Sequence, residues 1–257
     1  MKKISKIFIV LPFVILALGR ADLAYSSDFF KSIRKRTVVP SGIDTTVVFP
    51  GIRTNYSEID VSGAFSVRYS SSVKEVTVTA DGNLIPYLRI RTSGEELEIG
   101  LSGISINEIR RAEVCVPVSS RNLTSVELSG ACSFTSDITL SGRELSLDLS
   151  GASKVELDVD LKDLEIDLSG ASTACISGNA RSAEMDCSGA SKIKNHRGGC
   201  LNVEKASVDI SGAGSIRGLQ GGRISGDLSG AAKLTVLRGS DVSGVDCSGA
   251  ARINVID

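Results

Sequence analysis

The chain contains 257 residues with 29 basic and 30 acidic side chains, one histidine and no tryptophan, and 4% of its residues are aromatic. A net charge of −1 gives no overall positive field for a phosphate backbone, and so few aromatic side chains offer little surface for stacking bases or sugars, so we expect no nucleic-acid partner. A single histidine also excludes metal sites built on paired histidines and catalytic relays with several histidines.

The first residues have the composition of a secretory signal peptide. Three lysines precede an apolar run of 13 residues, Ile7 to Gly19, which is shorter than the roughly 20 residues of a membrane-spanning helix. Small residues permit cleavage after Gly19 or after Ser26. We therefore predict a signal peptide over 1–26 and an exported protein with no transmembrane segment after signal removal; an uncleaved anchor is the alternative.

A short basic stretch follows the predicted signal peptide. Four basic residues occur between Lys31 and Arg36, in a chain that is otherwise nearly neutral. Such a stretch can touch acidic lipid or glycan, but it is more typical of a solvated chain end. We predict a basic leader over 27–52, followed by one β-rich domain over 53–257.

The segment from about Thr54 to Val118 alternates apolar and polar residues in short runs, which indicates strands. The expected strands are Asp60–Tyr69, Val76–Thr79, Leu88–Leu101 and Ala112–Val118. We expect a turn over Asn83–Tyr87, which contains Pro86, and one short helix over Ile104–Arg111.

A Ser-Gly-Ala tripeptide recurs through the chain. After a first interval of 67 residues, its glycines are separated by 21, 19, 19, 23, 18 and 19 residues. The glycines are Gly63, Gly130, Gly151, Gly170, Gly189, Gly212, Gly230 and Gly249. Three residues earlier an acidic residue always occurs: Asp60, Glu127, Asp148, Asp167, Asp186, Asp209, Asp227 and Asp246. Two residues earlier the residue is always apolar: Val61, Leu128, Leu149, Leu168, Cys187, Ile210, Leu228 and Cys247.

This repeat predicts the fold. A unit of about 19 residues holds two or three short strands and their corners, but not a strand together with a helix. We therefore predict an all-β fold, a single-stranded parallel β-helix (β-solenoid) with turns of about 19 residues and less regular N-terminal coils, whose apolar columns stack inward. Further Ser-Gly pairs, which we expect to be corners, contain Gly142, Gly178, Gly226 and Gly244.

The chain resembles a known family in these motifs. The stretch Glu58–Leu101 (EIDVSGAFSVRYSSSVKEVTVTADGNLIPYLRIRTSGEELEIGL), the segment VELSGACSF and the serial DLSGAS repeats are similar to the auto-transporter adhesin head domain called the GIN domain, from about Arg53 to the C-terminus. The resemblance implies an exported β-helical protein of the cell envelope, common in Bacteroidota. It supplies no catalytic residues. Many members carry a lipid-attachment cysteine after the signal, whereas the first cysteine here is Cys115.

The acidic column places carboxylates about 4.8 Å apart on neighbouring coils, where they repel one another. Three kinds of group are candidates to offset this repulsion: serine hydroxyls, bound cations, and the basic residues three positions after the glycine. Those basic residues are Lys154, Lys192, Lys233 and Arg252. We expect mainly that Asp and Ser satisfy backbone amides at the corners, with calcium binding as the alternative. We predict no metal site and no cofactor.

The six cysteines are expected to be mainly free thiols. Cys187 and Cys247 occupy the same inward column but lie three turns apart, about 14 Å at the strand spacing, which is too far for a disulfide. We predict that both are small buried apolar residues. Bridging among Cys115, Cys132, Cys175 and Cys200 stays open.

We predict a non-enzymatic structural or binding module of the cell envelope, adhesin-like, that presents a polar face to a protein or glycan. The alternative is a carbohydrate-active β-helix enzyme, a polysaccharide lyase or hydrolase. We expect no catalytic residue, because the carboxylates repeat at every level and the lone His196 lies in a polar turn expected at the surface. The expected compartment is periplasmic, cell-surface-associated or extracellular. Exposed edge strands predict either end-to-end dimerisation or a cap from the N-terminal region.

Overall fold

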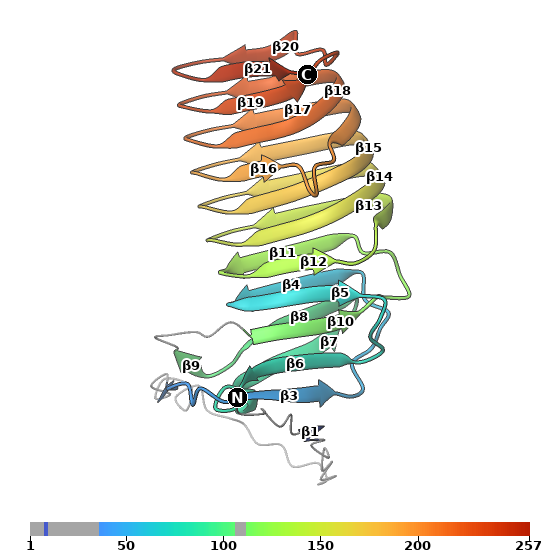
Figure 1. Cartoon of the computed structure of the whole chain (residues 1–257), viewed down its shortest axis with the longest axis vertical. Coiled ribbons are helices and arrows are strands. Elements are labelled where there is room, and N and C mark those ends of the chain that lie inside the picture. The colour runs from blue at the N-terminus through green and yellow to red at the C-terminus, as the bar shows by residue number, and fades with distance from the viewer. Residues whose placement is uncertain (1–7, 10–35, 106–111) are drawn as a thin grey trace, which may run out of the picture.

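A computed structural model describes residues 8–9, 36–105 and 112–257. Its strands stack along the length of a rod, with the N-terminal strands at one end and the C-terminal strands at the other (Figure 1). Apart from Phe8–Ile9, the predicted signal peptide lies outside the described residues, and so does the basic leader up to residue 35. No helix within the described ranges has both the length and the apolar composition to span a bilayer.

Almost every element of the described chain is a strand, as predicted. The strands are β1 (Phe8–Ile9), β2 (Arg36–Thr37), β3 (Asp44–Phe49), β4 (Glu58–Gly63), β5 (Phe65–Ser70), β6 (Val76–Asp81), β7 (Leu88–Ser93), β8 (Glu96–Leu101), β9 (Ile104–Ser105), β10 (Ala112–Pro117), β11 (Ser125–Gly130), β12 (Ser133–Ser136), β13 (Leu140–Leu149), β14 (Lys154–Leu168), β15 (Thr173–Cys187), β16 (Lys192–Lys194), β17 (Leu201–Ile210), β18 (Ser215–Leu228), β19 (Lys233–Leu237), β20 (Gly244–Cys247) and β21 (Arg252–Ile256). A 3₁₀ helix, η2 (Ile85–Tyr87), lies in the predicted Pro86 turn.

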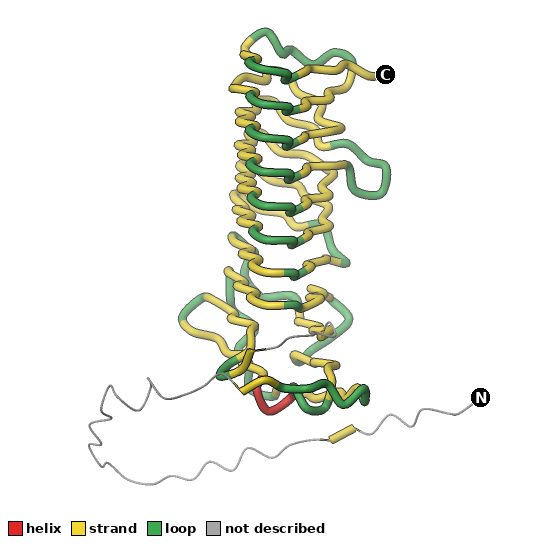
Figure 2. Tube along the Cα trace, turned by 90° about the vertical axis from the view of Figure 1, so that its left-hand side faces the viewer, coloured by secondary structure: helices red, strands yellow, loops and turns green. Residues whose placement is uncertain are grey.

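The coils stack in parallel with the register that the repeat predicts. Asp148 of β13 pairs with Asp167 of β14, and Asp167 pairs with Asp186 of β15, so each coil lies one 19-residue repeat above the last. The parallel β-solenoid is therefore confirmed. Each coil has two sheet segments, joined on one side by the Ser-Gly-Ala turn (Figure 2).

The second corner of each coil differs from the prediction. It is a pair of exposed polar residues, such as Lys162 and Asp163, between the buried Leu161 and Leu164. The Ser-Gly pairs at Gly178 and Gly226 lie inside β15 and β18 instead, so the prediction that they are corners was wrong. A side chain at either glycine would collide with the carbonyl oxygen of the coil below, which explains why glycine occurs there.

The Ser-Gly-Ala turns are held by backbone hydrogen bonds between coils. The Ala171 N–H donates to the Gly151 carbonyl at 2.8 Å, and the Ala190 N–H donates to the Gly170 carbonyl at 2.8 Å. The expectation that Asp and Ser side chains satisfy these amides was therefore wrong. Within the acidic column, one bond of this kind is formed in the described residues, from the Asp227 N–H to Asp209 Oδ1 at 3.0 Å.

The predicted inward column forms the core of the rod. Its members from Val61 to Leu228 are all buried, and Cys187 is only 2% exposed. Cys247 is exposed, however, because it lies in the last coil, where β20 pairs with β18 below it and with no other described strand. The prediction that Cys247 is buried was wrong for this reason.

The 67-residue interval between the first two motifs contains a cap. After β5 the chain returns to the end of the rod, where β8 pairs with β4 and β10 pairs with β5 in parallel. Further out, β7 is antiparallel to β8, and β6 is antiparallel to both β10 and β3. The predicted N-terminal cap is thus present, in the same sheet as the coils.

One buried carboxylate holds the cap in place. Asp81, at the end of β6, accepts hydrogen bonds from the Gly42 N–H at 2.6 Å and from the Asn83 N–H and the Ser41 hydroxyl at 3.0 Å. Burial by itself raises the pKa of Asp81, but these hydrogen bonds outweigh it and lower the pKa.

The predicted helix over Ile104–Arg111 is wrong at its start, because Ile104 and Ser105 form β9, which pairs in parallel with β2. Its remaining residues, 106–111, lie outside the described part of the chain.

At the other end of the rod, the described strands form no antiparallel layer. Val255 is 57% exposed and Ile256 is 37% exposed, whereas their partners in the coil below, Val236 and Leu237, are buried and half-buried. End-to-end dimerisation stays a prediction.

Candidate functional site

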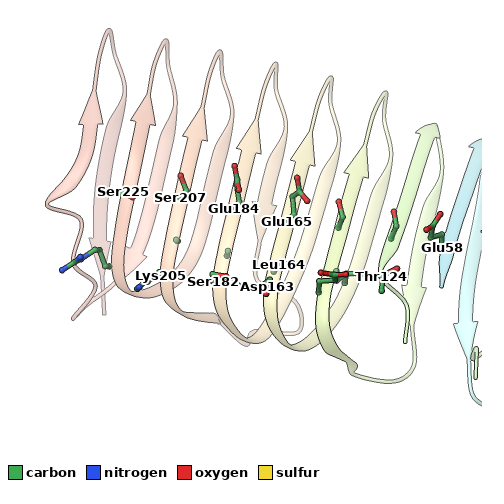
Figure 3. Close-up of a pocket in the computed structure, with 17 residues that line it drawn as sticks. Glu58, Thr124, Asp163, Leu164, Glu165, Ser182, Glu184, Lys205, Ser207 and Ser225 are labelled. Atoms are coloured by element: carbon green, nitrogen blue, oxygen red, sulfur yellow. Dashed lines mark hydrogen bonds between the residues drawn. The ribbon is translucent and has the colours of Figure 1, made fainter. Parts of the chain in front are cut away.

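A groove of about 770 Å³ runs along the polar corner and crosses the coils. Figure 3 shows two rows of side chains along it. The first row contains Glu165, Glu184, Ser207 and Ser225, which are register partners on successive coils. The second row contains Glu144, Asp163, Ser182, Lys205 and Arg223.

The groove has opposite charges at its two ends. Glu144, Asp163, Glu165 and Glu184 line the end nearer the cap, and Lys205 and Arg223 line the end nearer the C-terminus. Its lining includes an apolar row, in which Leu164 is followed by the smaller Ala183 and Ala206 on the next coils. No aromatic side chain lines the groove. It can therefore hold an extended polymer through ion pairs and hydrogen bonds, but not by ring stacking.

The acidic column lies on the outside of the sheet beside this groove. Burial raises the pKa of Asp186, and the charges of Asp167 and Asp209 raise it further. Burial and the neighbouring charges of Glu165 and Asp148 raise the pKa of Asp167 in the same way. The column is therefore a row of carboxylates that repel one another, as its spacing predicts.

The basic residues that the sequence suggested as partners of this column lie on the opposite sheet segment of each coil. Lys192, Lys233 and Arg252 follow the Ser-Gly-Ala turn, so they belong to β16, β19 and β21, whereas the acidic residues precede the turn. They do not neutralise the column. This separation could have been predicted, because a turn between two sheet segments sends the following residues to the opposite sheet.

Removing one carboxylate from the column should stabilise the rod at neutral pH. The folded-state pKa of Asp186 is raised above the usual value of about 3.9, so the folded chain favours the protonated carboxyl group. The resulting contribution of Asp186 to the free energy of unfolding is full below about pH 3.9 and is lost as pH rises through the folded-state pKa. Asp186→Asn should raise the free energy of unfolding at pH 7 by up to about 1 kcal/mol, with a smaller gain at pH 3. Chemical denaturation at both pH values measures this.

Glu75→Gln, in an exposed turn of the cap, is the matched control for Asp186→Asn. It removes one negative charge outside the column and should leave stability nearly unchanged. Equal effects of the two variants, or destabilisation by Asp186→Asn at pH 7, would contradict the repulsive column.

His196 lies in a loop, as predicted, but it is not a surface residue. It is 8% exposed, and its backbone is fixed by Ser177, whose Oγ accepts from the His196 N–H at 2.9 Å and donates to the His196 carbonyl at 2.7 Å. Its Nε2 lies 3.9 Å from Asp158 Oδ2, beyond hydrogen-bond distance. The prediction of an exposed histidine was wrong because the loop after β16 folds back onto the coils below (Figure 1).

This loop makes one level of the rod different from the others. The repeat predicts levels that are all alike, yet the loop adds residues between β16 and β17 at the edge of the rod (Figure 2). Arg197 in it has φ of 47°, the one positive value for a non-glycine residue in the described chain. The 23-residue spacing between Gly189 and Gly212 was the sequence signal for this insertion.

Cys115, Cys175, Cys187, Cys200 and Cys247 are free thiols in the structure, and the six cysteines differ in exposure. Burial raises the pKa of Cys187 to about 11, and burial also raises the pKa of Cys175. Cys132 is buried, and Cys247 is exposed at the end of the rod. Their reactivities should therefore differ widely, because the thiolate is the reactive form.

Thiol alkylation of the folded chain at pH 8 should modify Cys247 first and Cys187 last. Peptide mass spectrometry after timed exposure to iodoacetamide identifies the order, and the urea-unfolded chain should yield six alkylated cysteines. Fewer than four alkylated cysteines in the unfolded chain would contradict the prediction of mainly free thiols.

No group of three or more His, Cys, Asp or Glu side chains in the described residues is arranged to hold a metal ion. Calcium binding by the acidic column therefore has no preformed site among them.

Comparison with known proteins identifies relatives of most of the rod. The family model described as "Putative auto-transporter adhesin, head GIN domain" matches residues 55–239. No curated protein matches the chain.

Solved structures share the fold. A "putative adhesin" from Bacteroides fragilis NCTC 9343 superposes with a TM-score of 0.73 at 14% identity, covering 84% of this chain and 99% of the other. A "putative adhesin" from Parabacteroides distasonis ATCC 8503 gives 0.71 at 23% identity, covering 86% and 98%. A "putative lipid binding protein" from the same organism gives 0.65 at 19% identity, covering 86% and 100%. At these identities the likeness shows the fold alone.

Proposed function

Because the chain belongs to the family of auto-transporter adhesin head GIN domains, we propose that it is an exported, non-enzymatic, adhesin-like module of the cell envelope that binds an extended polymer along its rod. The observation that carries this proposal is the groove at the polar corner, which crosses several coils and offers a polar side chain at each level. The predicted signal peptide over 1–26 and the predicted leader over 27–52 are part of the same proposal.

An extended protein segment fits the groove better than a neutral glycan. Carboxylates at one end and Lys205 and Arg223 at the other complement a polypeptide that carries basic and acidic residues in turn. A neutral sugar is usually held by stacking on aromatic rings, and the lining contains none. The side chains in each row of the groove repeat at a fixed spacing of about 4.8 Å, which also suits a ligand that lies along the rod axis.

Binding to an array of immobilised proteins and polysaccharides tests this function. The wild-type chain should retain at least one immobilised protein, and Glu165→Gln combined with Glu184→Gln should weaken that retention about tenfold, as expected for the loss of two charged contacts. Glu75→Gln should retain it fully. Absence of binding, or equal binding by the groove variant, would contradict the proposal.

The alternative function is a carbohydrate-active enzyme, a lyase or hydrolase, and the observation that favours it is the level with the inserted loop. A general acid or base of such an enzyme needs a partner within hydrogen-bond reach. In this loop the His196 Nε2 faces Asp158 Oδ2, but the 3.9 Å between them is beyond that reach. His196→Ala should abolish polysaccharide cleavage if this level is catalytic, and should leave protein binding by the groove unchanged if the proposed function holds.

A further inference from the structure

A basic surface lies on the sheet opposite the acidic column, in the upper part of the rod. Four segments build it: β16, the first part of β18 over 215–220, β19 and β21. Together they carry five cations and no Asp or Glu. The cations, which we call the basic face, are Lys192, Lys194, Arg217, Lys233 and Arg252.

All five cations are available to a partner. Each side chain is exposed and alternates along its strand with an apolar residue that faces the core, such as Ile193 and Ile216. None of the five forms an ion pair with the described residues, whereas Arg197 and Arg238 nearby are paired with Asp158 and Asp257. A cation without a partner in the chain can contact an anionic ligand without first losing an ion pair.

The register places three of the cations, Lys192, Lys233 and Arg252, in a line along the rod. Lys192 pairs with Ser215, Ser215 with Lys233, and Lys233 with Arg252, so these residues stack on successive coils. Arg217 lies on the same coil as Ser215, so every coil from β16 to β21 presents a cation. The line spans three coil spacings, about 14 Å.

The surface around this line is hollowed. Two depressions of about 610 and 530 Å³ share Ser215, Arg217 and Ile256, and together they reach from Lys194 to Asn254. The loop after β16 supplies one wall through Asn195 and Gly198.

The wall is fixed in place. The Asn195 amide donates to the Gly199 carbonyl, and Asn195 lies where a side chain at Gly218 would collide with it. The register between β18 and β19 shifts at the same glycine, which is a β-bulge. Such irregularities are common beside binding sites, because they redirect neighbouring side chains.

We propose that the basic face binds a linear acidic polysaccharide that lies along the rod axis. Cations one coil apart supply ion pairs, and the Ser215, Thr235 and Asn254 side chains between them supply hydrogen bonds to sugar hydroxyls. The absence of aromatic rings among the lining residues, which excludes recognition by stacking, leaves charge as the means of holding a glycan.

Other anionic partners fit this surface less well. The five cations form a strip only two columns wide, which matches a linear polymer better than it matches the plane of an anionic membrane. Nucleic acid bound as a single strand normally stacks its bases on aromatic side chains, which these depressions lack. The groove of the proposed function lies at the polar corner of the coil, away from the basic face. Substitutions in the two surfaces therefore test the two proposals separately.

Retention of dextran sulfate, polygalacturonate and neutral dextran by the full chain tests the proposal. Both acidic polymers should be retained at low ionic strength and released as salt rises, and dextran should not be retained. Arg217→Gln combined with Lys233→Gln should weaken retention roughly tenfold, because two of the five cations are lost. Lys233→Arg should retain both polymers, since it keeps the charge.

The control removes two cations at the capped end. Arg53→Gln combined with Lys74→Gln changes the net charge equally and should leave retention unchanged. Equal losses in the two double variants would show a nonspecific charge effect and overturn the proposal. The proposal would also be overturned if neither dextran sulfate nor polygalacturonate were retained, or if phosphatidylglycerol vesicles were bound instead of these polymers. Self-association of the wild-type chain at low salt, with release of the polymers, would overturn it as well.

Discussion

Gly170→Ala should destabilise the rod by about 3 kcal/mol or more, because two separate costs coincide at this turn. Gly170 has φ of 70°, which an L-residue with a side chain adopts only at a cost. A Cβ there would also lie 2.7 Å from the Gly151 carbonyl oxygen, which accepts the hydrogen bond of the Ala171 N–H. The turn must therefore shift and weaken the contact between two coils.

Gly198→Ala separates these two costs. Gly198 has φ of 79°, but a Cβ there would meet no atom within 4 Å. Its loss should be about 1 kcal/mol, which is the cost of the backbone conformation alone. Urea denaturation of both variants measures the difference. Equal losses would show that close stacking of the turns is not what requires glycine.

Leu147→Ala should destabilise the chain by about 3 kcal/mol, because it leaves a cavity in the middle of the stacked core. Leu147 is fully buried, and its register partners Val126 and Ile166 lie directly below and above it. The rod confines these side chains between two close sheets, so the surrounding structure has little freedom to fill the space. Thermal and urea unfolding both report the loss.

Leu237→Ala is the matched control for the core. Leu237 carries the same side chain but lies half-buried near the open end, in β19. Its truncation should cost less than half as much, because part of its surface is already in contact with water. A loss equal to that of Leu147→Ala would indicate that the open end is covered in solution.

The repeat predicted the coils because each position in it serves one physical role at every level. An acidic residue, an apolar residue and Ser-Gly-Ala recur in that order, and the register pairs Asp167 with Asp186 and Leu168 with Cys187 as expected. Cys247 has the right position in the repeat but lies in the last coil, so the pattern alone did not reveal its exposure.

The cap could not be predicted from the same pattern. Its antiparallel strand β6 pairs with β3 and β10, which lie about 30 residues away on either side in the chain, and an alternating strand carries no mark of its partner. In contrast, β7 pairs with β8, the next strand along the chain. His196 was misjudged for a similar reason, since the loop composition is polar whether or not the loop folds back onto the rod.

The candidate surfaces were predicted only in part. The acidic column follows directly from the repeat, but the groove lies at a corner that no motif of the sequence marked. The basic face requires Lys192, Arg217 and Lys233 to be placed on successive coils, which needs the register rather than the composition.

The central claim is that this chain binds polymers without changing them, and one measurement tests it most directly. Polygalacturonate and other polysaccharides are incubated with the full chain, and the retained fraction and the polymer length are measured in the same samples over time. Retention with unchanged length and no accumulating reducing ends is the predicted result. Progressive shortening, with many cleavages per molecule of protein, would contradict it and favour the carbohydrate-active enzyme.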